Sequence, residues 1–538
     1  MFLSCLSRLT RRPAARAVAA ACAISLLPVA PAGLQAQVSL PALGDSVSSD
    51  FGPGAERRLG EQVMRDIRRD PDYLDDPLLL EYLQSIWEPL VAAARQRGNI
   101  NAETDSRFAW EVFLVRDRSV NAFALPGGFV GVHLGLIAMT ATRDELASVL
   151  AHELSHVTQR HIARSLANQG RQSLIATAAM ILGVIAASRA GSPDGVSAAI
   201  AGGQAVAIQG MLNYSRDMER EADRVGFGVF SAAGFAPAGM ATMFDKLDAA
   251  SRLNDSNSFP YLRTHPLTTE RIGEARARLG TTRAAAPGSQ LEDEVMRAHA
   301  RVLMDTREES LRREQAADAQ SGQLPAGKRL AMLVASAEAS IRLRDTARSE
   351  KAIEAALAVA SGGAGSDARA LRAMRLIQVQ VLLAGGDAQR AAAALRAVPD
   401  DGSRPLRLAR VQVALADSAG DGRAEALRRS AEDLQTWVAT HPNDAMAWEM
   451  LAQAWTKAGR PLRAVRAEAE SRVAIGDLTG AADRLRAGQR LAREPGVKPD
   501  EFIEVSVIDA RLREIEAQRR QLAAEMRGNG SGRDGSRP

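Results

Sequence analysis

Apolar residues along this chain recur mostly at helical spacing, and only one short region has the pattern of strands. The spacing predicts helices around residues 55–70 and 77–97. The segment FAWEVFLVR at 108–116 predicts a strand, and 120–132 predicts two strands joined by a Pro-Gly-Gly turn at 126–128. The first half of the chain is therefore expected to be mainly helical, with a small β-sheet.

Two further helices carry the residues on which the functional argument depends. Thr142 and Glu145 form a T-x-x-E capping box, so a helix is predicted to begin at Thr142. Another helix is predicted over 218–230, with Ser215 as its N-cap and an apolar stripe along one face.

Between these helices lie two apolar stretches, at 173–187 and 196–212. The first is shorter than the ~20 residues that a membrane helix needs, and glycines end the run. One interpretation of 173–212 is a hairpin that packs on the protein or covers a cleft. The other is a surface that contacts a membrane or a hydrophobic client.

Beyond residue 290 the chain becomes rich in Ala, Leu and Arg, with short Gly-Asp turns. Trp448 and Trp455 match the spacing of tetratricopeptide repeats, and Gly386 and Gly420 are separated by the period of that repeat. We therefore expect an all-α tetratricopeptide-like solenoid. A plain helical bundle is the alternative.

The N-terminus has the features of a secretory signal. Four arginines precede an apolar run at 17–27 that is too short to span a bilayer, and Ala30-Pro31-Ala32 is a small-x-small cleavage site. An uncleaved anchor or a buried helix is the alternative. The arginines of residues 1–36 account for the whole formal net charge of +4, so the neutral remainder gives no support for binding nucleic acid. Both cysteines also lie there, which suits a periplasmic protein without disulfides or metal-binding thiols.

The most specific chemical signal is H-E-x-x-H at 152–156, within the helix predicted to begin at Thr142. A four-residue step places His152 and His156 on one helix face, where both imidazoles can bind Zn²⁺. Glu153 can then act as a general base on water at the metal. This pattern predicts a metal-dependent peptide hydrolase.

A catalytic zinc takes three protein ligands, so a third is expected from the helix at 218–230. Glu219 lies beside the apolar stripe and has Asp223 one turn further on, whereas Glu221 shares a face with charged residues. We expect Glu219 to be the ligand and Asp223 to orient a metal-bound imidazole. Glu221 is expected to be an ordinary surface charge.

Two other histidines bear on the site. His265, in a Thr-His-Pro loop, is positioned to reach the metal from outside, either as a regulatory fourth ligand or as a structural loop residue. A histidine in the open coordination position would keep the enzyme latent until the loop moved. His161, after the motif helix, is expected to face solvent or to cap the helix.

Three segments together resemble the M48 family of gluzincin-type zinc metallopeptidases: the motif at 152–156, EREADRVG at 219–226, and NAFALPGGFV at 121–130. The resemblance implies one Zn²⁺ per chain, an edge strand at 121–125 lining the substrate cleft, and His265 as the switch of a plug loop.

For the site residues, the resemblance implies that His152, His156 and Glu219 bind the zinc. It implies that Glu153 is the general base, and that Asp223 donates a proton or orients the reacting groups.

With its signal and repeats, the chain is most similar to periplasmic members of the family. That similarity implies quality control of outer-membrane β-barrel proteins: assembly of productive ones, with chaperone-like activity, and degradation of misassembled ones. The partners would be unfolded or misassembled outer-membrane proteins and the barrel assembly machinery, which the repeats would bind. The alternative is mainly a chaperone or scaffold with a latent metal site.

The expected organisation has four parts. Residues 1–36 are a signal peptide, 37–285 an M48-like metalloprotease domain with a small β-sheet, and 290–526 a tetratricopeptide-like helical domain. Residues 527–538, rich in Gly, Ser and Arg, are expected to be a disordered tail.

Overall fold

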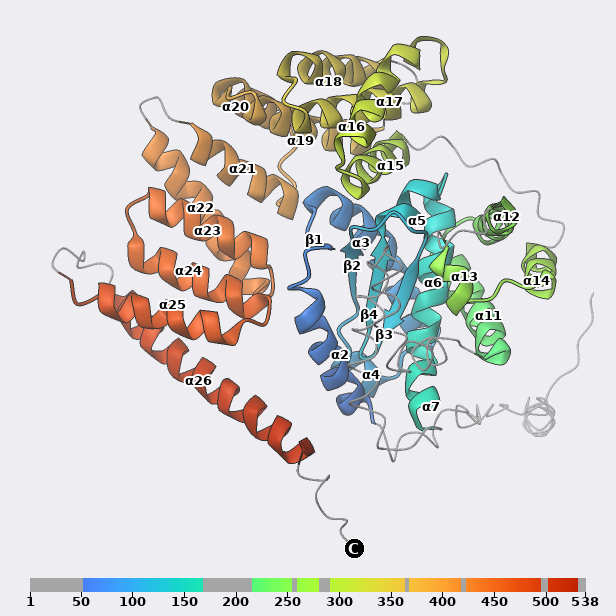
Figure 1. Ribbon diagram of the computed structural model, residues 1–538, viewed down its shortest axis with the longest axis horizontal. Helices are drawn as coiled ribbons and strands as arrows, with labels where there is room; N and C mark the ends of the chain where they lie inside the picture. The colour runs from blue at the N-terminus through green and yellow to red at the C-terminus, as the bar shows by residue number, and fades with distance from the viewer. Residues whose placement is uncertain are drawn as a thin grey trace, which may run out of the picture. The chain divides into compact units, whose positions relative to one another are not determined.

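The computed structural model describes seven stretches of the chain (Figure 1), which are residues 52–167, 215–253, 259–279, 291–362, 367–417, 422–494 and 502–530. The signal peptide expected at 1–36 and the apolar segment at 173–212 lie outside them. So does the end of the predicted tail, although helix α26 (Phe502–Gly530) continues past Arg527, where that tail was expected to begin.

A four-stranded sheet lies in the first half of the chain and has the order β1-β2-β4-β3. Strand β2 pairs parallel with β4, and β3 pairs antiparallel with β4. The predicted turn joins β3 to β4, and its Gly127 and Gly128 both have positive φ, which favours glycine. The strands are β1 (Tyr73–Leu74), β2 (Glu111–Val115), β3 (Ala122–Leu125) and β4 (Phe129–His133).

Helices surround this sheet, and the predicted helix starts at Thr142 and Ser215 are confirmed. Because every residue of α6 from Glu145 to Val157 is buried, α6 is a central helix rather than an amphipathic surface helix. The helices are α2 (Pro53–Ile67), α3 (Pro77–Gln96), α4 (Ala102–Arg107), α5 (Leu134–Met139), α6 (Arg143–Thr158), α7 (His161–Ala167), α11 (Arg216–Ala232), α12 (Ala238–Leu253), α13 (Pro260–Thr264) and α14 (Thr269–Leu279).

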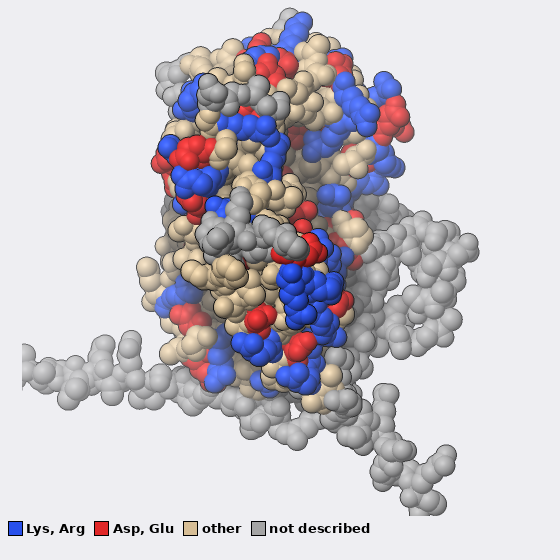
Figure 2. All heavy atoms as spheres, turned by 90° about the vertical axis from the view of Figure 1, so that its left-hand side faces the viewer, with Lys and Arg blue, Asp and Glu red and all other residues tan. Residues whose placement is uncertain are grey.

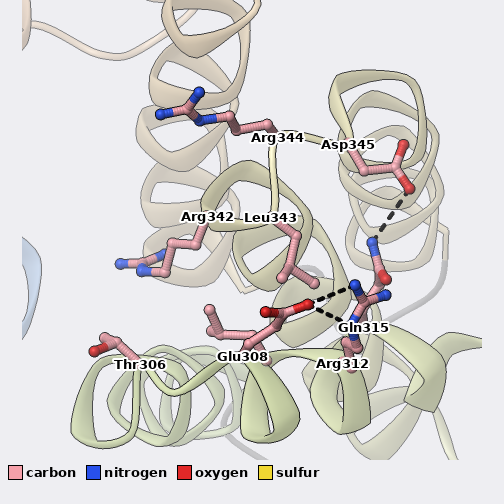
Figure 3. Close-up of a pocket in the computed structure, with 9 residues that line it drawn as sticks. Thr306, Glu308, Arg312, Gln315, Arg342, Leu343, Arg344 and Asp345 are labelled. Carbon is pink, nitrogen blue, oxygen red and sulfur yellow. Dashed lines mark hydrogen bonds and ion pairs between the residues drawn. The ribbon is translucent and has the colours of Figure 1, made fainter.

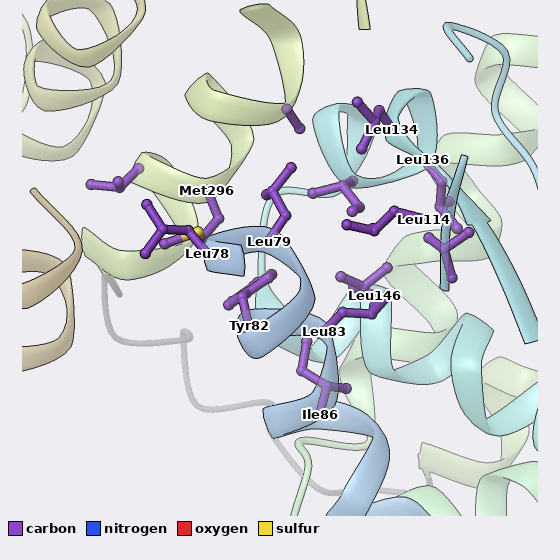
Figure 4. Packing of buried hydrophobic residues seen from close by; sticks show 14 of the residues in the cluster. Leu78, Leu79, Tyr82, Leu83, Ile86, Leu114, Leu134, Leu136, Leu146 and Met296 are labelled. Carbon is purple, nitrogen blue, oxygen red and sulfur yellow. The ribbon is translucent and has the colours of Figure 1, made fainter. Parts of the chain in front are cut away.

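Leucines from three elements form the centre of the apolar core. Figure 4 shows Leu79 and Leu83 of α3 close to Leu114 of β2 and Leu146 of α6, and all four side chains are fully buried. Burial of each contributes about 1.5–3 kcal/mol. This packing fixes α6 against the sheet and α3.

The described residues beyond 290 form helices and turns without strands, as predicted, and consecutive helices pack against each other. The description as tetratricopeptide repeats stays a prediction. The elements are α15 (Leu291–Met304), α16 (Glu308–Ala316), the 3₁₀ helix η4 (Ala317–Gln323), α17 (Ala326–Arg342), α18 (Thr346–Ser361), α19 (Ala368–Ala384), α20 (Ala388–Arg396), α21 (Arg404–Ala416), α22 (Arg423–Thr440), α23 (Ala445–Lys457), α24 (Pro461–Ala474), α25 (Leu478–Leu491) and α26.

Four of the described turns in this region end a helix in the same way. The turns at Gly386, Gly459 and Gly476 have left-handed glycines, and the turn after α17 has Arg344 at φ 62° in the equivalent place. A cavity of about 520 Å³ lies beside Arg344, between α16 and the α17–α18 turn (Figure 3). Arg342 and Arg344 extend to the same side of this turn, while Asp345 is hydrogen bonded to Gln315.

The surface of the helical region carries charges of both signs. Figure 2 shows Lys and Arg interspersed with Asp and Glu, and many of these side chains pair within one helix, as Arg428 does with Glu425 and Glu432. Within the described stretches, we find no helix with the length and apolar character needed to cross a membrane.

Candidate metal centre

Helix α6 positions the two histidines of the motif. The hydroxyl of Thr142 accepts a hydrogen bond from the backbone N–H of Glu145, and the Glu145 carboxylate accepts one from Ala141 at 2.6 Å. The helix therefore has a capped, fixed start. His152 and His156 are almost fully buried, and their Nε2 atoms lie 3.0 Å apart.

Helix α11 brings Glu219 to the same point. A Cβ on Gly226 would lie only 3.1 Å from the Ala151 carbonyl oxygen, so glycine allows α11 and α6 to approach closely. The Glu219 carboxylate consequently lies 3.5 Å from His152 Nε2 and 3.4 Å from His156 Nε2. The structure thus places Glu219, as expected, beside both histidines.

His265, which directly follows helix α13, is the fourth residue of the cluster. Its Nδ1 lies 3.0 Å from Glu219 Oε1 and 3.3 Å from His152 Nε2, and only 2% of the residue is exposed. The ring stacks on Tyr261, with centroids 4.6 Å apart. The predicted approach of this loop to the metal ligands is therefore present in the structure.

Glu153 is fully buried at the side of the cluster. The backbone N–H of Ala124 approaches its carboxylate, whose oxygens have no side-chain hydrogen-bond partner among the described residues, and His265 Nε2 lies 3.5 Å from Oε1. Burial raises the pKa of Glu153, although the charge of His265 opposes that rise. A fully buried carboxylate without a side-chain hydrogen bond is costly, which indicates a functional role for this side chain.

Asp223 is held so that it orients His152. One carboxylate oxygen lies 2.9 Å from His152 Nδ1, and Arg271 binds both oxygens, at 2.6 and 2.8 Å. Burial raises the pKa of Asp223, but these hydrogen bonds outweigh it and lower the pKa to about 2. The arrangement suits the orienting role better than the proton-donating role.

Arg271, on α14, is a functional residue that the sequence did not indicate. Its third nitrogen lies 2.7 Å from Glu219 Oε2, so one guanidinium contacts both a metal ligand and the orienting Asp223. The sequence carries no signal for it, because nothing in the spacing of α14 indicates which arginine turns inward.

Two expectations about neighbouring residues were wrong. Glu221 is not an ordinary surface charge, and His161 does not face solvent. Glu221 Oε2 lies 3.1 Å from His161 Nε2 and accepts a hydrogen bond from Arg164 at 2.8 Å. His161 is fully buried, with Nδ1 2.9 Å from Nδ1 of His156. Helical periodicity did not predict the burial of His161, because that burial arises where α7 turns back toward α6.

The four clustered residues fit a metal ion. His152, His156, Glu219 and His265 each offer a ligand atom, and these atoms all lie within 4.8 Å of one another. Ligands around tetrahedral zinc at its usual bond lengths are roughly 3.3 Å apart, close to the separations observed here.

The charges at the cluster also favour a cation. Burial alone lowers the pKa of His152, but the charge of Glu219 and a hydrogen bond to Asp223 raise it to about 10. The negative potential that holds a proton at His152 equally favours a metal ion. Histidine and carboxylate ligands together are typical of zinc.

These features define a class of protein. Two histidines from H-E-x-x-H, a glutamate from a second helix and a buried glutamate beside them are the arrangement of a gluzincin-type metallopeptidase. Residues 77–279 match the model of peptidase family M48, within the range 37–285 predicted for this domain. The chain therefore contains an M48 metallopeptidase domain.

Individual relatives agree with this family. The chain is 36% identical over 261 residues to the beta-barrel assembly-enhancing protease of Escherichia coli (strain K12). The aligned residues cover 48% of this chain and 51% of the relative. For the protein of the same name from Yersinia pestis, the identity is 37% over 245 residues, covering 46% of this chain and 48% of the relative. The chain thus spans about half the length of these relatives.

A more distant similarity is to the mitochondrial metalloendopeptidase OMA1 of Schizosaccharomyces pombe. That protein is 29% identical over 234 residues, which is 42% of this chain and 61% of the relative.

Proposed function

We propose that this chain is a periplasmic zinc-dependent endopeptidase with chaperone-like activity, acting in the quality control and assembly of outer-membrane β-barrel proteins and degrading misassembled ones. The observation that carries the proposal is the buried cluster of His152, His156, Glu219 and His265 with Glu153 beside it. The names of the E. coli and Y. pestis relatives support the substrate class.

In the proposed reaction, each site residue has a separate task. A bound zinc supplies Lewis-acid polarisation of the scissile carbonyl and lowers the pKa of water. Glu153 takes the proton of the attacking water and passes it to the leaving amine. Its raised pKa brings this carboxyl closer to the pH at which a general base works best. Asp223 and Arg271 hold His152 in place.

The substrate would bind along β3, which is an edge strand of the described sheet, as the family resemblance implied. His133 donates its backbone N–H to Asn121, so the hydrogen bonds to β4 fall on alternate residues from Asn121 onward. The backbone N–H and C=O groups of Ala122 and Ala124 therefore point away from β4. An extended peptide would pair with them by β-augmentation, next to Glu153.

His265 would make the enzyme latent. A catalytic zinc keeps one position open for water, and His265 lies where it would fill that position as a fourth protein ligand. Movement of the loop after α13 would then start proteolysis. The same geometry favours the second candidate function, a chaperone or scaffold whose metal site stays inactive.

The proposed location and partners rest on sequence features outside the site. The basic and apolar pattern of residues 1–36 supports export to the periplasm. The helices beyond residue 290 would bind the barrel assembly machinery, because helical arrays provide extended binding surfaces.

The test compares degradation of casein, a loosely folded protein, by the purified chain and three variants. Glu153→Gln should lower the rate by about 10²–10⁴-fold without loss of bound zinc. His265→Ala should be faster than the wild type, and the exposed His441→Ala is the control.

Equal inactivity of wild type, Glu153→Gln and His265→Ala with zinc bound would refute the protease proposal. It would leave the chaperone or scaffold function.

A further inference from the structure

The second nitrogen of each motif histidine is in contact with another side chain. For His152 the partner is Asp223. For His156 it is His161, whose Nδ1 lies 2.9 Å from Nδ1 of His156. The two rings meet nearly edge to face, at 77°, with centroids 4.8 Å apart. Both histidines are buried, so this contact is shielded from solvent.

A tight turn brings His161 back to His156. Helix α6 ends at Thr158, α7 begins at His161, and Arg160 between them has a left-handed φ of 52°. A non-glycine residue in this conformation costs about 1 kcal/mol. An ion pair of 3.0 Å between Arg160 and the buried Glu56 helps to hold the turn.

Hydrogen-bond chemistry fixes the protons along this contact. The ionised carboxylate of Glu221 can only accept, and it already accepts from Arg164, so Nε2 of His161 must carry a hydrogen. In a neutral His161, Nδ1 is then an acceptor, and the hydrogen between the rings belongs to Nδ1 of His156. This leaves the lone pair of His156 Nε2 directed at Glu219 and His152, as a metal ligand requires.

We propose that His161, held by Glu221 and Arg164, is a positioning residue that fixes the tautomer and orientation of His156 for metal binding. The inference deepens the proposed function and depends on it, because it requires a metal at the cluster. Each motif histidine is then oriented by a carboxylate, directly or through a second histidine, and that carboxylate is itself paired with an arginine. Asp223, paired with Arg271, contacts His152 directly. Glu221, paired with Arg164, contacts His161, which in turn contacts His156.

The test measures the zinc affinity of the full chain by competition with a chromophoric chelator. Loss of such an outer partner typically weakens metal binding about 10–100-fold, and we expect this range for His161→Leu and Glu221→Leu. His161→Asn keeps an acceptor near the position of Nδ1, so it should recover part of the affinity. Glu309→Leu is the matched control, because Glu309 also pairs with an arginine but is exposed and lies on α16, outside the elements that form the metal centre.

A purely structural role for His161 predicts a different result. It would lower the melting temperature of the metal-free chain equally in His161→Leu and His161→Asn, without a difference in their zinc affinities. If both Leu variants bind zinc as tightly as Glu309→Leu, the assignment is wrong while the proposed function stands. If the wild type binds no zinc, the proposed function fails, and this assignment fails with it.

Should His161→Leu not fold, Glu221→Gln decides the matter. This variant keeps an acceptor for His161 but not the charge. Zinc affinity between those of wild type and Glu221→Leu supports the assignment, and affinity equal to Glu221→Leu contradicts it.

Discussion

At the scale of single residues, the site depends on buried charges that compensate one another. Burial by itself raises the pKa of Glu219, but the charges of His265 and His152 outweigh it and hold the pKa far below its usual range. Arg271 is only 4% exposed and contacts both Glu219 and Asp223. Removing one member of such a buried network leaves the others unpaired, which typically costs about 3–5 kcal/mol.

A conservative change at Arg271 tests whether the planar guanidinium group, with its three contacting nitrogens, is needed at the site. Arg271→Lys keeps the charge but cannot bind Asp223 through two nitrogens while also contacting Glu219. We expect zinc affinity to fall about 10–100-fold, measured by chelator competition. Arg276→Lys, at an exposed ion pair with Asp245, should leave the affinity unchanged. Unchanged affinity in Arg271→Lys would show that the charge alone suffices.

At the scale of elements, the sheet edge and the helix-ending turns have distinct roles. The backbone groups of Ala122 and Ala124 on strand β3 point away from β4, whereas the turns between the C-terminal helices determine how the chain reverses. The turns at Gly386 and Gly476 have glycine where a left-handed conformation is required, and Arg344 departs from that rule.

Proline in the edge strand tests the proposed pairing of substrate with β3. Ala122→Pro removes one outward N–H without breaking the ladder to β4, because that N–H does not bond to β4. The N–H of Ala124 is unsuitable for this test because it approaches the carboxylate of Glu153. Casein degradation should fall by about 5–10-fold or more, equivalent to a lost hydrogen bond of ~1 kcal/mol or more, with the melting temperature nearly unchanged. Ala122→Gly, which keeps the N–H, is the control. Equal activity of the two variants would refute pairing at this position.

The turn after α17 predicts a stabilising mutation. Arg344→Gly removes the left-handed strain and matches the other three turns, so it should stabilise the chain by up to about 1 kcal/mol. Thermal unfolding measures the effect. Gly386→Arg, the reverse change at an equivalent turn, should destabilise by a similar amount. A lower melting temperature for Arg344→Gly would show that its side chain contributes to stability.

At the scale of the whole molecule, buried polar contacts join the first helices to the C-terminal ones. His299 of α15 lies 3.0 Å from Asp76, the N-cap of α3, and 2.6 Å from Glu338 of α17. Arg404 of α21 binds Asp75 at 2.7 Å. A single hydrophobic cluster also includes residues from α3 to α21. The peptidase part and the first C-terminal helices therefore share a core.

The His299 contact predicts a pH dependence of stability. Burial lowers the pKa of His299, but the charges of Asp76 and Glu338 outweigh it and raise the pKa to about 10. Because this folded-state pKa exceeds the unfolded value of about 6.5, the stabilisation is fully present below about pH 6.5 and is lost as pH rises toward 10.

His299→Gln should therefore lower the melting temperature most near pH 6.5. The difference from wild type should shrink progressively up to pH 10, and His441→Gln, at an exposed histidine, should show no such trend. A difference that stays constant with pH would contradict the ion-pair explanation.

The sequence by itself determined the local features of this protein. The capped start of α6, the strand-turn-strand at 120–132 and the positions of His152, His156 and Glu219 depend on spacing and on neighbouring residues, which a sequence displays directly. The choice of Glu219 over Glu221 could also be made, because the apolar stripe of α11 shows which face is buried.

Only the tertiary structure decided which distant side chains complete the site. Arg271 reaches Asp223 from α14, and His161 turns back to His156 because Arg160 adopts a left-handed conformation. Glu221 is consequently the partner of a buried histidine and is not an ordinary surface charge. Helical periodicity describes one helix at a time, whereas these contacts depend on how α6, α7, α11 and α14 pack, and that packing is set by long-range burial.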